Sequence, residues 1–214
     1  MNLPIFIYCI VLAILVGSIY YDHLKPSRLH LFLPFLVLTL LVELLGLYMK
    51  YLDKSNSILY NVFIMIQVLF STWFFTKAGI SPSLRKFLNG ALIVYLFAIL
   101  LHYIFLPASP FSTWLFLLGG LLVVLAGLFF LLNFFLLDNR SKEMVYSPVI
   151  PVAMGLIAFF SVCSIVFSFL PQIKYYDLEI GGEKLYNFLP RMMSIILYLC
   201  FAYAFFLCRK PVQA

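Results

Sequence analysis

Long apolar runs separated by short polar stretches fill the sequence from end to end. Seven runs reach about 20 residues, the length at which a helix crosses the roughly 30 Å hydrocarbon core of a bilayer. They cover residues 3–20, 29–49, 57–76, 87–106, 111–137, 149–170 and 188–207. The pattern predicts an all-α polytopic membrane protein, a seven-transmembrane-helix bundle in one domain over residues 1–214.

Composition supports the membrane class. Of the 214 residues, 65% are hydrophobic and 10% are charged, whereas about a quarter of a soluble domain is charged. The first run has no basic segment before it and no A-x-A-like cleavage site, so we expect a mature helix rather than a secretory signal.

If each run crosses the membrane, the Lys and Arg residues of the connecting loops are distributed unequally between its two sides. With the N-terminus outside, four are outside (Lys50, Lys54, Lys174, Lys184) and nine are inside (Lys25, Arg28, Lys77, Arg85, Lys86, Arg140, Lys142, Arg209, Lys210). Because basic loops stay cytoplasmic, this bias predicts an outer N-terminus and an inner C-terminus. No basic segment is long enough to follow a phosphate backbone, so we expect no nucleic-acid partner and assign the net charge of +6 to topology and anionic lipids.

Small and polar residues recur at helical spacing and indicate which helix faces point inward. Thr39, Glu43, Gly46 and Lys50 share one face of the second run. Gly119, Ala126 and Asn133 share a face of the fifth. In lipid, helices associate through such residues, so these faces are predicted to pack against protein.

Three ionisable residues lie within the outer third of the predicted bundle. Glu43 is about 9 Å and His102 about 6 Å from the outer ends of their runs, and Arg191 lies just inside the start of the last. An ionisable group at membrane depth is costly and usually faces protein or water. We therefore expect Glu43 to lie inside the bundle beside Asn61, His102 or Arg191.

The tripeptide Leu-Tyr-Asn occurs twice, ending at Asn61 and Asn187, each time where an inward-running helix is expected to begin. The position suits Asn as a helix cap and Tyr as an interfacial anchor, with Pro190 in the first turn of the last helix. The recurrence also suggests a three-plus-one-plus-three helix order with an internal repeat.

The ligand-binding candidates are polar residues of these faces and outer boundaries: Glu43, Tyr60, Asn61, Gln67, Tyr95, His102, Arg191 and Tyr198. They predict a binding protein of the receptor or transporter type, with an outward-facing polar pocket for a small molecule or a lipid headgroup. The alternatives are an intramembrane enzyme acting on a lipid or other apolar substrate, and a structural subunit of a membrane protein partner. The four cysteines form no CxxC pair, and no HExxH, GxSxG or P-loop motif occurs, so we expect no metal and no cofactor.

The seven runs and the stretch SILYNVFIMIQVLF, residues 57–70, resemble small, uncharacterised multi-pass bacterial membrane proteins. That resemblance implies a location in the bacterial inner membrane among membrane lipids, and it implies no particular activity. Retinal proteins are similar in helix number, but the last run lacks the lysine that their Schiff base requires.

The charge bias gives a topology test. Cysteines introduced at Ser55 and Ser141, in a background without the native cysteines, should react with a membrane-impermeant thiol reagent from opposite sides, Ser55 from outside. Labelling of both positions from the same side would contradict the orientation.

Overall fold

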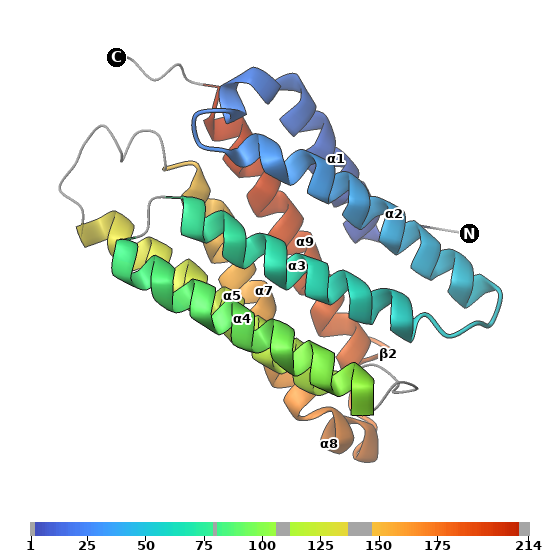
Figure 1. Cartoon of the computed structure of the whole chain (residues 1–214). Coiled ribbons are helices and arrows are strands. Elements are labelled where there is room, and N and C mark those ends of the chain that lie inside the picture. The colour runs from blue at the N-terminus through green and yellow to red at the C-terminus, as the bar shows by residue number, and fades with distance from the viewer. Residues whose placement is uncertain (1–2, 79–80, 106–111, 137–146, 210–214) are drawn as a thin grey trace.

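Antiparallel helices make up most of the computed structural model, which describes residues 3–78, 81–105, 112–136 and 147–209 (Figure 1). The helices are α1 (Ile5–Ile19), α2 (Phe32–Tyr51), α3 (Ser57–Lys77), α4 (Pro82–Phe105), α5 (Thr113–Leu136), α7 (Val149–Ser168), α8 (Leu170–Tyr175) and α9 (Leu185–Leu207). Two 3-10 turns, Tyr21–Leu24 and Leu29–Leu31, connect α1 to α2, and strands β1 (Glu179–Ile180) and β2 (Glu183–Lys184) form a hairpin before α9. Arg140, Ser141, Lys142 and Lys210, which the predicted orientation and its test use, lie outside the described residues.

In the described part of the chain, six helices of 20 to 24 residues are long and apolar enough to cross a membrane: α2 with the turn before it, α3, α4, α5, α7 and α9. They indicate an integral membrane protein. The predicted seventh span is not confirmed, because the first run forms the 15-residue α1, which rises only about 22 Å. The sidedness and the internal repeat stay predictions.

Several helix boundaries differ from those predicted from hydropathy. α4 begins at Pro82 rather than at residue 87, since a proline is well tolerated in a first turn. α9 begins at Leu185, directly after β2, so the prediction that Pro190 lies in the first turn is wrong: Pro190 lies inside the helix. Its missing N–H leaves the carbonyl of Tyr186 without a helical hydrogen bond.

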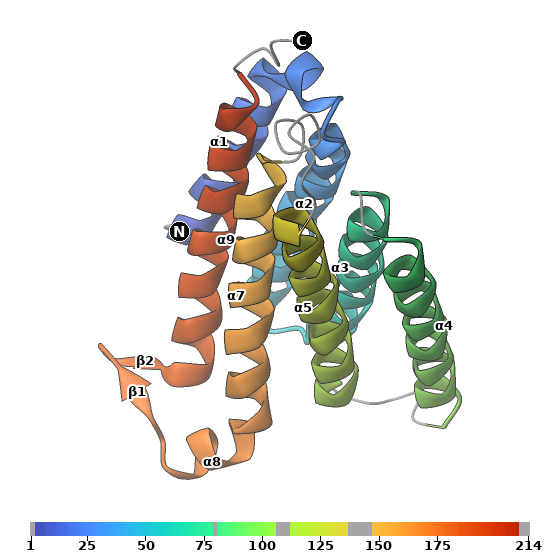
Figure 2. The ribbon, with the colours of Figure 1, turned by 90° about the vertical axis from the view of Figure 1, so that its left-hand side faces the viewer.

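Six helices close a ring in the order α1, α2, α3, α5, α7, α9, each packed against its two neighbours (Figure 2). α4 lies outside this ring against α3 and α5, and only Leu88 and Tyr95 of its 24 residues are buried. We call the end of the ring with the α2–α3 connection, α8 and the β1–β2 hairpin the hairpin end (Figure 1).

Phenylalanine side chains fill the half of the ring away from the hairpin end. The ring centroid of Phe32 lies 4.6 Å from that of Phe74 and 4.8 Å from that of Phe201, and Phe35 stacks on Phe70 at 4.6 Å. Aromatic pairs at these separations attract one another beyond simple burial of area. This phenylalanine cluster therefore joins α2, α3 and α9 through the middle of the ring.

α5 approaches its neighbours closely at the predicted small-residue face. A Cβ atom added at Gly119 would lie 2.6 Å from Val68 Cγ2 of α3 and 2.7 Å from Tyr95 Oη of α4. Ala126, two turns along, is fully buried. Both residues therefore pack against protein, as predicted.

Gly119→Leu should lower the melting temperature in detergent, because the new side chain overlaps Val68 and Tyr95. Overpacking of this kind costs about 1–3 kcal/mol. Gly90→Leu on α4 is the matched control, since no atom lies within 4 Å of a Cβ added there. Equal melting temperatures for the two variants would place the Gly119 face outside the helix packing.

Candidate functional site

A cavity of about 520 Å³ lies inside the helix ring at the hairpin end. α2, α3, α7, α8 and α9 provide most of its lining, with Phe116 from α5 and Phe6 from the beginning of α1. Five of the eight predicted site residues line it: Glu43, Tyr60, Gln67, Arg191 and Tyr198. These side chains come from three helices, so the cavity depends on the tertiary fold.

The carboxylate of Glu43 accepts a hydrogen bond from the hydroxyl of Tyr60, with 2.9 Å between Oε2 and Oη. Both side chains are half-buried. A charge-assisted hydrogen bond of this kind is stronger than one between neutral groups. The predicted interfacial anchor Tyr60 thus joins α3 to α2 inside the protein.

Gly46 makes this contact sterically possible. A Cβ atom at position 46 would lie 2.4 Å from Tyr60 Oη, so only glycine lets the tyrosine ring lie against α2. Asn56, at the start of α3, donates to the Gly46 carbonyl across 3.4 Å. The sequence placed Gly46 on the inward face but did not indicate that it admits Tyr60.

Arg191 and Tyr198 complete the polar part of the cavity from α9. Arg191 interacts electrostatically with Glu43, and its guanidinium forms an ion pair with Glu183 of β2. Tyr198 is buried two turns further along α9 and interacts with Glu43 and Tyr60. Of the three partners predicted for Glu43, Arg191 is the one that lines the cavity with it.

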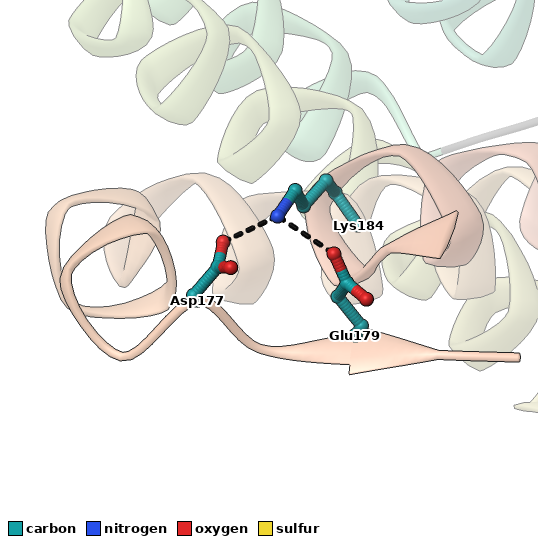
Figure 3. A network of polar contacts seen from close by, with 3 residues as sticks. All are labelled: Asp177, Glu179 and Lys184. Carbon is teal, nitrogen blue, oxygen red and sulfur yellow. Dashed lines mark hydrogen bonds and ion pairs between the residues drawn. The ribbon is translucent and has the colours of Figure 1, made fainter. Parts of the chain in front are cut away.

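The β1–β2 hairpin holds the remaining nearby acids in ion pairs of their own. Lys184 Nζ lies 2.5 Å from Asp177 Oδ1 and 2.6 Å from Glu179 Oε1 (Figure 3). Hydrogen bonds that Lys184 donates to these two carboxylates raise its pKa above the ordinary value. Gly181 and Gly182, both with positive φ, form the two-residue turn that brings β2 back beside β1.

The other three predicted site residues lie away from the cavity lining. Asn61 accepts a hydrogen bond from the backbone N–H of Ser112 across 3.0 Å, so it serves the start of α5 instead of capping α3 as predicted. Tyr95 donates to the Leu115 carbonyl at 3.3 Å, and the His102 ring packs edge-on against Tyr103. The Asn61 bond joins α3 to the start of α5 and the Tyr95 bond joins α4 to α5, whereas the His102 contact stays within α4.

Several residues that line the cavity were not among the predicted site residues. Lys50 lies two turns after Glu43 on the same face of α2, and this spacing could have indicated that it lines the same site. Lys174 of α8 and the aromatic residues Phe63, Phe159 and Phe167 carried no such signal. An apolar residue within an apolar run does not reveal which of its neighbours it faces.

No family model, curated protein or solved structure matches this chain. The geometry of the cavity therefore carries the functional argument. Among the described residues, no group of three or more His, Cys, Asp or Glu side chains is arranged to hold a metal ion.

Tyr60→Phe should lower the free energy of unfolding by about 1–3 kcal/mol, because it leaves the half-buried Glu43 carboxylate without its donor. The measurement is thermal or denaturant unfolding in detergent. Tyr48→Phe, on the exposed side of α2, is the control and should leave stability unchanged. Equal stability of the two variants would mean that the Tyr60–Glu43 bond does not hold α2 to α3.

Proposed function

We propose that this chain is an integral membrane binding protein of the receptor kind, whose ligand, a small molecule or a lipid headgroup, binds in the cavity at the hairpin end. The observation that carries the proposal is the convergence of Glu43, Tyr60, Gln67, Arg191 and Tyr198 on one space of about 520 Å³. Ligand sites are typically concave, mostly apolar and supplied with a few placed polar groups, in volumes of about 300–1,000 Å³.

The inner boundary of the cavity favours binding over passage through the protein. Beyond Gln67, the same face of α3 carries one further polar residue, the fully buried Ser71, and then Phe74, which packs on Phe32. Phe63 of the lining stacks on Phe35 at 6.1 Å, and Phe35 belongs to the phenylalanine cluster. A transporter needs polar groups that continue inward, whereas a receptor site can end on an apolar floor.

Thr39 lies on the inward face of α2, one turn further from the hairpin end than Glu43. Its hydroxyl donates to the Phe35 carbonyl of its own helix across 2.8 Å. This bond stays within α2. The alternative of an intramembrane enzyme would rely on Glu43 as its base, and no further observation favours it.

A tryptophan in the cavity tests the proposal. Ile64 lines the cavity and Ile66, on the same helix, is exposed outside it. Wild-type protein and Ile66→Trp, extracted from their own membrane, should both retain a bound small molecule or lipid by native mass spectrometry. Ile64→Trp should lose that bound mass because the indole occupies its space.

Glu43→Gln separates a binding role from a purely structural one. In a binding site the variant should keep its melting temperature while its occupancy changes. Loss of stability with full occupancy would assign Glu43 to helix packing. The proposal fails if wild type, Ile64→Trp and Ile66→Trp carry the same bound species, or if wild type carries none.

A further inference from the structure

The cavity lining combines three cationic side chains with an aromatic surface. Lys50 from α2, Lys174 from α8 and Arg191 from α9 all line it, and we call these three residues the cationic rim. Glu43 is the one carboxylate among the described lining residues. It lies about 10 Å along α2 from Lys50, and of the three rim residues it is Arg191 that interacts with it electrostatically.

The acids beside the rim are paired with cations other than its two lysines. Lys184 binds Asp177 and Glu179, and Arg191 pairs with Glu183 (Figure 3 shows the Lys184 pairs). In the described part of the chain, this leaves Lys50 and Lys174 without a carboxylate partner. Their two ammonium groups are therefore available to an anion.

The geometry of the rim fits an anionic headgroup. Lys174 lies over the Tyr186 ring, with Nζ 5.7 Å from the centroid, which holds the ammonium in place without consuming its N–H donors in a carboxylate pair. Lysine offers three N–H donors and arginine five, so the rim can donate to several oxygens of one phosphate or carboxylate.

The aromatic part of the lining fits an apolar chain. Phe63, Phe116, Phe159 and Phe167, from three different helices, line the same cavity as the rim. A free inorganic anion would leave this aromatic surface uncovered on the cavity side, whereas an alkyl or isoprenoid chain would cover it.

Resting on the proposed binding function, we propose that the ligand is an anionic amphiphile. Its phosphate or carboxylate group binds Lys50, Lys174 and Arg191, and its apolar chain lies against the aromatic lining. Glu43 accepts a hydrogen bond from the Tyr60 hydroxyl and interacts electrostatically with Arg191, and both contacts offset its negative charge.

Three single-chain probes of equal chain length test the charge preference: dodecyl phosphate, dodecyltrimethylammonium and dodecyl maltoside. Titration calorimetry uses the full-length protein in phosphatidylcholine nanodiscs, with empty nanodiscs subtracted. Dodecyl phosphate should bind most tightly. Removing both ammonium groups in Lys50→Ala/Lys174→Ala should weaken it by about tenfold or more, as expected for the loss of charge-assisted hydrogen bonds.

Lys54→Ala/Lys77→Ala is the matched control, because it removes the same charge from residues outside the lining and should leave the affinity unchanged. If both double variants lose the same affinity for dodecyl phosphate, the preference comes from general surface charge and the proposal is overturned. Inorganic phosphate in large excess should not displace dodecyl phosphate. Full displacement would identify a free anion as the ligand and also overturn it.

The outcomes separate this inference from the function on which it rests. If all three probes bind equally and Ile64→Trp abolishes their binding, the cavity is a ligand site and the anion preference is wrong. If Ile64→Trp changes the binding of none of the probes, the cavity is not a binding site and the proposed function fails with the inference.

Discussion

The packing of Phe32 against Phe70 and Phe74 of α3 and Phe201 of α9 is the contact on which the helix ring depends. α2 and α9 are separated in the ring by α1, and α1 has only 15 residues. Where the phenylalanine cluster fills the ring, no space remains. The short α1 does not extend as far towards the hairpin end as its neighbours, and the phenylalanine cluster stops at Phe63. In that half of the ring the helices therefore enclose a cavity.

Polar side chains collect in this cavity because hydrocarbon offers them no partner. Glu43 obtains its hydrogen bond from Tyr60, and the absence of a side chain at Gly46 permits the approach. The need for a hydrogen-bond partner also explains the position of Asn61, which accepts a hydrogen bond from the backbone N–H of Ser112 directly before α5. Two neighbouring residues of α3 thus serve different helices, because successive positions on a helix point about 100° apart.

The hairpin controls the charge beside the cavity. Lys184 pairs with Asp177 and Glu179, and Arg191 pairs with Glu183. Exposed ion pairs contribute little to stability, so this arrangement has its main effect on the local potential. Pro190, inside α9, also removes a backbone hydrogen bond beside Arg191.

The sequence by itself determined the membrane class, the approximate position of each helix and the inward face of α2, because hydropathy and helical period are local properties of the chain. It also included Glu43, Tyr60, Gln67, Arg191 and Tyr198 among its polar candidates, and these five line one cavity. Only the tertiary structure decided that Tyr95 and His102 lie away from that cavity. Which helix faces meet depends on contacts between distant segments, such as Gly46 with Tyr60 and Phe32 with Phe201, and no local pattern encodes them.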